Sequence, residues 1–355
     1  MRISDFSRCA LGIGAAVAIL AACSGETQSQ LGPAGPTQQN VAQPGLNSQL
    51  YSRLVKPDKS AVQFAYVVDF DSNNISAYTI ATSGALGVVA GSPFTAATHP
   101  FGVAIDPKGR FAYVSNDDSA NVSAYTIDAT SGALAAVAGS PFAAGSSPHG
   151  VAIDPKGKFA YVTNFSDDTV SAYKINATSG ALTPVAGSPF ATGSQPGWMA
   201  VDPKGKFAYV SNEGSADVSA YRINATSGAL TAVAGSPFAA GSGPVWVVVD
   251  PRGKFAYVPN DSSNNVSAYT INANSGALTA VAGSPFAAGT NPQGVAVDPK
   301  DKFAYVANNG SANISAYTIN ATSGALTAVA GSPFTAGTGP WGVSVDPTDK
   351  FAYAS

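Results

Sequence analysis

The stretch FAYVTNFSDDTVSAY, residues 159–173, decides the fold because the chain repeats it with few changes. Close copies begin at Phe64, Phe111, Phe207, Phe255 and Phe303, and a shortened copy, FAYAS, ends at Ser355. An Asp-Pro pair marks the same period of 48 residues, at Asp106, Asp154, Asp202, Asp250, Asp298 and Asp346. Although 355 residues could form two ordinary domains, a period of this length predicts one repeat architecture.

Each repeat contains four segments of strand length, separated by turn signals. In one copy they are GVAIDP (residues 150–155), KFAYVTN, TVSAYKIN and ALTPVAGSPF. The first three are rich in Val, Ile, Tyr and Phe, and none has a helical period. The D-P-K-G segment has the residue preferences of a type I turn, and N-A-T-S-G-A-L predicts a hairpin loop with Gly in the left-handed conformation. The repeat is therefore a four-stranded antiparallel sheet.

Both faces of this sheet are apolar. Phe159 and Tyr161 point to one side of their strand, and Ala160 and Val162 point to the other. Neighbouring copies must therefore cover both faces. Four strands in 40 to 50 residues, packed radially, predict an all-β protein, a β-propeller of four-stranded blades. A linear β-solenoid is the alternative, but its coils are shorter than 48 residues.

The number of blades has two solutions. Seven blades, the favoured count, result if LYSRLV, near Leu50, is a degenerate first strand and residues 341–355 begin a seventh, incomplete blade. Six blades result if GVSVDP (residues 342–347) closes the ring beside residues 64–68 and leaves FAYAS unused.

The N-terminal residues predict a targeting signal rather than a folded domain. Arg2 and Arg8 precede the apolar run CALGIGAAVAIL, which is short for a membrane span, and Leu20-Ala21-Ala22-Cys23 resembles a bacterial lipobox. The resemblance implies that residues 1–22 are a signal peptide and that Cys23 carries lipid. It also implies a lipoprotein of the cell envelope at the outer membrane, since Ser24 follows the cysteine. An ordinary signal peptide is the alternative. Residues 23–50 are predicted to be a flexible tether rich in Gln, Gly, Pro and Ser, and residues 51–355 the propeller.

Composition excludes several functions. Charged residues make up 11% of the chain, against about a quarter in ordinary domains, and apolar residues make up 45%. The net charge of −3 gives no basis for a nucleic-acid partner. There is no phosphate-binding loop, zinc spacing or nucleophile elbow. If Cys9 leaves with the signal, Cys23 is the remaining cysteine, so a disulfide within the mature chain is excluded.

The copies differ most just after the Pro that begins each inner strand. All three tryptophans lie in this window, and large or polar residues replace one another there. We expect these side chains to surround the mouth of the central channel and to bind a small ligand or a protein. The alternative is that they only fill the channel. The candidate ligand-binding residues are Phe101, His149, Trp198, Trp246, Gln293 and Trp341.

The two ends of the propeller are predicted to differ in charge. Loops after the second strand, on the same face as this window, contain many carboxylates, including Asp117, Asp118, Glu213 and Asp261. The D-P-K-G-K turns on the opposite face contain most of the lysines. Ca²⁺ at the acidic loops is one interpretation, and turn formation by Asp and Asn is the favoured one. We therefore expect no cofactor and no metal.

The repeated motif P-x-G-V-A-V-D-P-x-G-K-F-x-Y-V-x-N resembles the lactonase-type seven-bladed propellers, related to 6-phosphogluconolactonase, and the YVTN-repeat proteins. The letters YVTN themselves occur at residues 161–164, and the resemblance covers residue 64 to the end. It implies a lactone hydrolase with His149 as the catalytic base. No arginine accompanies His149, and an exported protein would not meet a phosphorylated sugar. Non-catalytic binding is therefore the favoured hypothesis, and lactone hydrolysis is the alternative.

Overall fold

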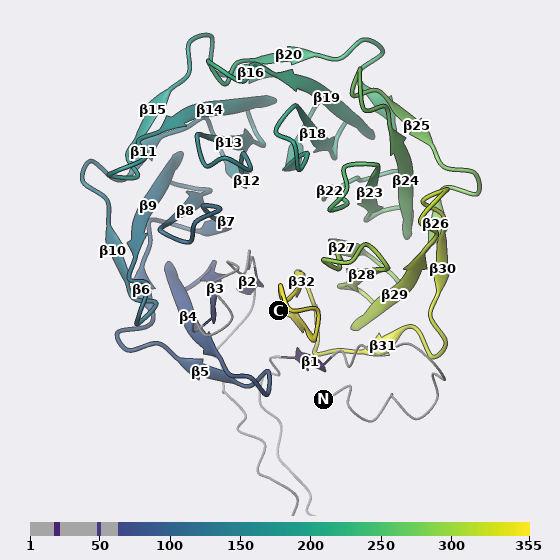
Figure 1. Cartoon of the computed structure of the whole chain (residues 1–355), viewed down its shortest axis with the longest axis horizontal. Helices are drawn as coiled ribbons and strands as arrows, with labels where there is room; N and C mark the ends of the chain where they lie inside the picture. The colour runs from purple at the N-terminus through teal and green to yellow at the C-terminus, as the bar shows by residue number, and fades with distance from the viewer. Residues whose placement is uncertain (1–17, 22–47, 51–62) are drawn as a thin grey trace, which may run out of the picture.

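The computed structural model describes residues 18–21, 48–50 and 63–355, and these residues form β-strands grouped around a central axis (Figure 1). No α-helix occurs within these ranges. This confirms the prediction of an all-β propeller. The described ranges also contain no helix that could cross a membrane. The rest of the predicted signal peptide and tether, including Cys23, lies outside the described residues.

Six sheets have the same five-stranded pattern. The innermost strands are β2 (Ser48–Leu50), β7 (Pro100–Ile105), β12 (Pro148–Ile153), β17 (Pro196–Val201), β22 (Val248–Val249) and β27 (Pro292–Val297). The second strands are β3 (Gln63–Asp69), β8 (Phe111–Asn116), β13 (Phe159–Asn164), β18 (Phe207–Asn212), β23 (Phe255–Asn260) and β28 (Phe303–Asn308). The third strands are β4 (Asn74–Ile80), β9 (Asn121–Ile127), β14 (Thr169–Ile175), β19 (Asp217–Ile223), β24 (Asn265–Ile271) and β29 (Asn313–Ile319).

The fourth segment of each repeat forms two short strands rather than one. The first set is β5 (Leu86–Val88), β10 (Leu134–Ala136), β15 (Leu182–Pro184), β20 (Leu230–Ala232), β25 (Leu278–Ala280) and β30 (Leu326–Ala328). The second set is β6 (Phe94–Thr95), β11 (Phe142–Ala143), β16 (Phe190–Ala191), β21 (Phe238–Ala239), β26 (Phe286–Ala287) and β31 (Phe334–Thr335). Both sets pair with the third strand of their own blade.

The described residues thus contain six complete blades, the count of the alternative prediction, and a seventh, incomplete sheet. The first blade is completed by β2, which lies at the end of the predicted tether and shares only Leu50 with the predicted strand LYSRLV. At the other end of the chain, β32 (Val343–Val345) pairs with β33 (Phe351–Ala354) rather than with β3. β1 (Ala18–Ala21), within the predicted signal peptide, pairs in parallel with β33.

The core lies between blades rather than within them. Phe159 and Tyr161 pack with residues of the next blade, whereas Ala160 and Val162 pack with the preceding blade. The predicted division of strand faces is therefore confirmed. Burial of apolar side chains on both faces supplies most of the favourable free energy of folding. This burial occurs only when neighbouring blades pack against each other.

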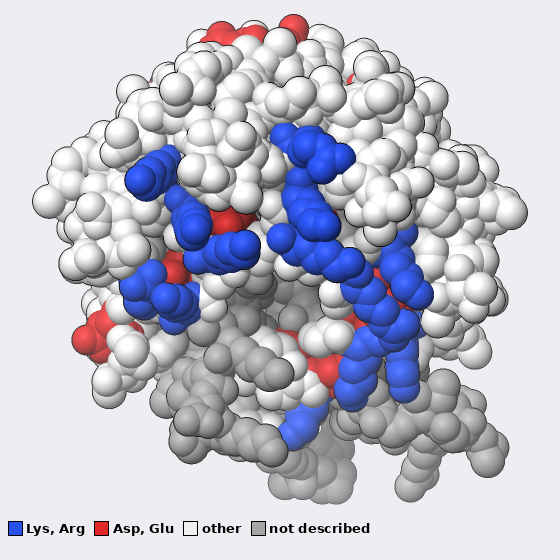
Figure 2. All heavy atoms as spheres, turned by 45° about the horizontal axis from the view of Figure 1, so that its top comes forward, with Lys and Arg blue, Asp and Glu red and all other residues white. Residues whose placement is uncertain are grey.

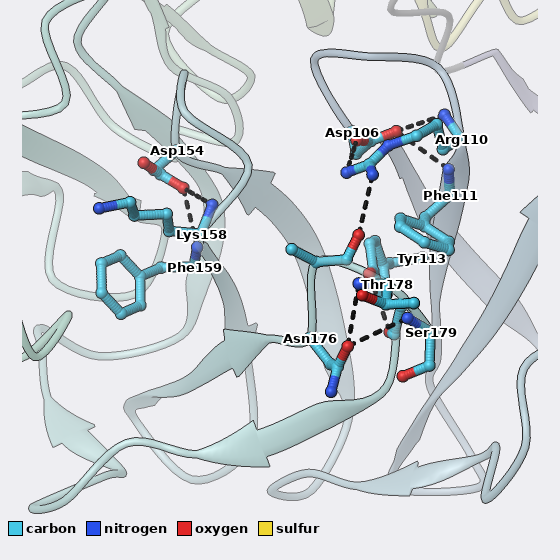
Figure 3. Close-up of polar contacts among 12 residues, drawn as sticks. Asp106, Arg110, Phe111, Tyr113, Asp154, Lys158, Phe159, Asn176, Thr178 and Ser179 are labelled. Carbon is cyan, nitrogen blue, oxygen red and sulfur yellow. Dashed lines mark hydrogen bonds and ion pairs between the residues drawn. The ribbon is translucent and has the colours of Figure 1, made fainter.

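Buried hydrogen bonds also link neighbouring blades. The Tyr161 hydroxyl is buried and donates to the carbonyl of Gly228, in the hairpin of the next blade. Figure 3 shows this arrangement one blade earlier, where Tyr113 approaches the hairpin that contains Asn176. The hairpin glycine has a positive φ, and a Cβ there would overlap the Phe ring of the preceding blade, at 2.4 Å in the case of Gly228 and Phe159. Glycine is therefore required both by conformation and by contact.

Candidate functional site at the channel mouth

Strand register separates the two ends of the propeller. Pro148, which begins an inner strand, pairs with Asn164, which ends a second strand. The same end therefore holds the residues after Pro and the loops after the second strand. We call it the mouth face. The opposite end holds the D-P turns, and we call it the turn face.

The mouth face is acidic. Between residues 63 and 355 it contains no Lys or Arg, because all of these lie in the D-P turns or near the end of a third strand. Its carboxylates are Asp69, Asp71, Asp117, Asp118, Asp167, Asp168, Glu213, Asp217 and Asp261. Any ligand at this end therefore meets a negative potential, which disfavours the binding of an anion.

His149 lies between two aromatic rings. Its imidazole stacks on Phe101, with ring centroids 3.9 Å apart, and on Phe165 from the loop of its own blade, at 4.4 Å. The His149 side chain is 14% exposed. Burial lowers the pKa of His149 to about 4, because the rings replace the water that would solvate an imidazolium. At neutral pH the imidazole is therefore uncharged.

Asp117 faces this imidazole from the neighbouring blade. Its Oδ1 lies 3.8 Å from His149 Nε2, beyond hydrogen-bonding distance, and is buried without a hydrogen-bond partner in the described structure. Burial is the main cause that raises the pKa of the Asp117 carboxyl, and the negative charge of Asp118 adds to the rise. A hydrogen bond from Ser147 and the nearby His99 act in the opposite direction. A carboxylate oxygen of this kind is a candidate proton acceptor.

A second pair of carboxyl groups lies further around the mouth. Gln293 Nε2 donates to Asp261 Oδ1 at 3.1 Å. Burial, followed by the negative charge of Asp261, raises the pKa of Glu213. Gln293 is thus held by a carboxylate rather than oriented freely toward a ligand.

Trp198 and Trp246 form a second aromatic contact among the predicted site residues. Their rings stack at 4.0 Å, and Trp198 is buried, with 8% of its surface exposed. A Cβ on Gly150 would meet Trp198 at 2.9 Å, and a Cβ on Gly102, two blades away from Trp198, would meet it at 3.1 Å. The Trp198 ring therefore crosses the inner strands of two preceding blades. Binding of a ligand by these two tryptophans, and the alternative that they fill the channel, both stay predictions.

The predicted site residues therefore separate into two groups. The Phe101 ring contacts both His149 and Trp341. It stacks on His149 and meets Trp341 edge-on, with ring centroids 6.5 Å apart. Trp198 and Trp246 form a separate stack. Sequence reasoning missed Phe165 and Phe70, which stack on His149 and His99 respectively. The sequence did contain a pattern that could have indicated these two phenylalanines. The residue after the last position of each second strand varies between copies as much as the residue after Pro does, and it is Phe70, Asp117, Phe165, Glu213, Asp261 or Asn309.

Other carboxylates on this face shape the loops. Asp167 Oδ2 accepts a hydrogen bond from the Ser146 amide, and Asp168 Oδ1 accepts one from the Gln195 amide, both at 2.7 Å. Across the part of the chain that the structure describes, no three His, Cys, Asp or Glu side chains gather as a metal site would require. The expectation of no metal, with Ca²⁺ at these loops as the alternative, stays a prediction.

These features define a class of protein, a propeller with an acidic channel mouth in which a half-buried carboxylate faces an uncharged imidazole. The family model "Lactonase, 7-bladed beta-propeller" matches residues 58–144 and 140–345, which is most of the chain. The protein therefore belongs to the lactonase family of seven-bladed β-propellers, as the repeated motif indicated. No curated protein sequence matches it.

Solved structures show the same fold. A 6-phosphogluconolactonase candidate from Bacteroides fragilis has a TM-score of 0.71 at 22% identity, covering 85% of this chain and 87% of that one. A similar candidate from Bacteroides uniformis has a TM-score of 0.70 at 22% identity, covering 80% and 85%. The periplasmic gluconolactonase of Pseudomonas aeruginosa has a TM-score of 0.68 at 20% identity, covering 80% and 85%.

Together, the family and these neighbours support the lactone-hydrolase alternative better than the favoured hypothesis of non-catalytic binding. At this level of identity the neighbours show the fold alone. Which residues act, and on which lactone, must come from the site itself.

Proposed function

We propose that this protein hydrolyses a lactone that carries no phosphate, with Asp117 as general base and His149 as its uncharged partner. One observation carries the proposal: the buried Asp117 Oδ1 has no hydrogen-bond partner and lies 3.8 Å from His149 Nε2. Oδ1 has no solvent contact in the described structure, so a side-chain movement must admit the water, and a water bound to both atoms then has its proton acceptor in place.

The division of roles differs from the one implied by the resemblance. An imidazole with a pKa of about 4 is a weak base at neutral pH, whereas a carboxylate with a raised pKa is a stronger base than an ordinary one. His149 in its neutral form can still donate one hydrogen bond from Nε2, provided that this nitrogen holds the proton. It then orients the water or the lactone carbonyl, and Asp117 accepts the proton.

The reaction balances with these two groups. Asp117 takes a proton from water, and the water oxygen bonds to the lactone carbonyl carbon. The tetrahedral intermediate collapses as the ring C–O bond breaks, and the leaving ring oxygen takes the proton from Asp117. The product is a hydroxy acid in which the former ring oxygen is a hydroxyl. Its new carboxylic acid loses its proton to solvent water at neutral pH, and the resulting carboxylate is repelled by the acidic mouth, which favours release.

The negative charge of the mouth face also restricts which lactones can be substrates. Phosphate recognition uses Lys, Arg or a cluster of amide donors, and between residues 63 and 355 the mouth face has no Lys or Arg. A phosphorylated lactone would place at least one further negative charge beside Asp117, Glu213 and Asp261. A neutral sugar lactone has no such penalty, and its ring can lie against Phe101 and Trp341.

The test is lactone hydrolysis measured above the spontaneous rate. We expect glucono-1,5-lactone to be hydrolysed and its 6-phosphate to be a poorer substrate. Asp117→Asn should lower kcat by roughly a hundredfold or more, the usual contribution of a positioned base. Activity should fall as the pH drops through the raised pKa of Asp117, because protonation removes the accepting oxygen.

A matched control is the neighbouring carboxylate, Asp118, which is exposed and bonds to His99 instead. Asp118→Asn should retain most of the activity. The proposal is wrong if Asp117→Asn keeps the wild-type rate, or if no lactone is hydrolysed above background by a correctly folded protein.

The second candidate is binding without catalysis. It is favoured by the half-buried rings of Phe101 and Trp341, which present stacking surfaces at the mouth. Under this hypothesis, calorimetry would detect a sugar lactone or its hydroxy acid bound without turnover. Trp341→Ala would weaken that binding by about tenfold, and Asp117→Asn would change it little.

A further inference from the structure

The turn face holds every Lys and Arg found between residues 63 and 355. The turn lysines and arginines are Lys108, Arg110, Lys156, Lys158, Lys204, Lys206, Arg252, Lys254, Lys300, Lys302 and Lys350, and Lys174 and Arg222 lie beside them. All of these except Arg110 are exposed. Figure 2 shows Lys and Arg side chains in two groups on either side of a central hollow, with some Asp and Glu side chains visible beside them.

The Asp of each Asp-Pro pair is directed away from this surface. Asp154 is buried, and its Oδ1 accepts hydrogen bonds from the backbone amides of Lys158 and Phe159, at 2.5 and 2.8 Å (Figure 3). The equivalent Asp in the other turns is also buried. Because the carboxylate of each Asp-Pro pair points inward to close its turn, the exposed side chains of these turns are mainly those of lysine.

Few of these cations are occupied by ion pairs. The described residues contain three such pairs on the turn face: Arg110–Asp106, Arg252–Asp301 and Lys300–Asp349. Lys156, Lys158, Lys204 and Lys206, on two adjacent blades, have none. These four lysines are therefore available to an external anion.

The surface suits a broad anionic partner better than a small one. The turns are copies of one unit, so their lysines lie at equal height around the ring and do not converge on one point. No large apolar side chain is exposed on this face among the described residues, since the exposed one, Val88, lies on the outer strand β5. Contact would therefore be electrostatic, without insertion of apolar groups.

We infer that the turn face docks on a bilayer surface rich in anionic phospholipids. Each Lys or Arg near such a surface adds a favourable, salt-dependent contribution, and clusters of four or more suffice for peripheral binding. The acidic mouth face is repelled by the same surface. Docking therefore orients the propeller with its channel mouth directed away from the bilayer, open to solutes. The inference does not depend on lactone hydrolysis.

The test is co-sedimentation of the full chain with vesicles of phosphatidylcholine, with and without phosphatidylglycerol. We expect binding to the anionic vesicles in excess of that to the neutral ones. Raising the ionic strength from about 0.05 M to about 0.5 M should remove the excess, since the Debye length shortens several-fold. Binding to the neutral vesicles measures the contribution of the N-terminal residues to membrane binding. All variants have the same N-terminal residues, so this contribution is the same in each.

Two quadruple variants separate charge from structure. Replacing Lys156, Lys158, Lys204 and Lys206 with Gln should weaken binding to anionic vesicles by at least about tenfold, whereas replacing the same four with Arg should retain it. Equal binding to both kinds of vesicle, or a Gln variant that binds like wild type, would overturn the inference. Tighter binding to double-stranded DNA than to anionic vesicles at the same salt concentration would also overturn it. So would head-to-tail self-association in sedimentation velocity without vesicle binding.

Discussion

The hydroxyl of Tyr353 donates a hydrogen bond to the carbonyl of Gly84 at 3.2 Å, although the two residues are 269 positions apart. This is the contact that Tyr161 makes with Gly228 between two consecutive blades. The Phe351 ring also covers Gly84, as Phe159 covers Gly228. The incomplete seventh sheet therefore closes the ring with the same inter-blade contacts as the complete blades (Figure 1).

Tyr353→Phe tests this closure. Loss of one buried hydrogen bond should lower the free energy of unfolding by about 1 kcal/mol, measured by denaturant titration. Tyr305→Phe is the control, because the seventh sheet offers Tyr305 no hairpin carbonyl among the described residues. If both variants lose the same stability, the Tyr353–Gly84 bond does not contribute to closure.

Asp301 replaces the turn glycine of other repeats, with φ +59°, and is buried against Asp250 of the preceding blade. Burial and then the charge of Asp250 raise its pKa to about 6, above the ordinary value of 3.8. The folded state therefore favours the protonated acid. Its carboxylate destabilises the fold above about pH 6, and this penalty disappears as the pH falls below the unfolded pKa.

Asp301→Gly should accordingly stabilise the protein at pH 7, with a smaller effect at pH 4. At pH 4 the remaining gain is the conformational preference of Gly at positive φ, on the order of 1 kcal/mol. The loss of the Arg252 pair subtracts little, because that arginine is largely exposed. The measurement is the difference in unfolding free energy between variant and wild type at the two pH values. A difference that grows on acidification would contradict the assignment.

Trp198→Ala should act on stability more than on function. The ring is buried and fills space above Gly102 and Gly150, so its removal leaves a cavity that costs roughly 3–5 kcal/mol. Trp341→Ala, at a half-buried mouth position, should cost roughly 1 kcal/mol. Thermal and denaturant unfolding of the two variants would compare them directly. Equal losses would mean that the Trp198 side chain is packed no more tightly than that of Trp341.

Lipid attachment at Cys23 stays a prediction from the sequence. Cys23→Ser should move the protein from the membrane to the soluble fraction at high salt, where docking through the turn face is screened. Fractionation of cells that express each form, at low and high salt, measures both effects. Unchanged membrane association at high salt would show that Cys23 carries no anchor.

Much of the fold follows from local sequence. The alternation of Phe159, Ala160, Tyr161 and Val162 specifies a strand with two apolar faces, and the repeated Asp-Pro turns specify where each strand reverses. The separation of charge between the two ends follows as well, because the register of an antiparallel repeat sends all D-P-K-G-K turns to one end. These features depend on neighbours within a single 48-residue unit.

Other features depend on contacts between units that are far apart in sequence. Closure through Tyr353 and Gly84 requires the relative position of the first and last sheets, which no single repeat encodes. The lowered pKa of His149 and the raised pKa of Asp117 arise from burial among side chains of adjacent blades. In the same way, the sequence placed Trp198 in one window with His149, but only the structure shows that its ring packs over glycines of two other blades. Desolvation and packing are properties of the assembled ring, because they depend on distances that exist only after the blades meet.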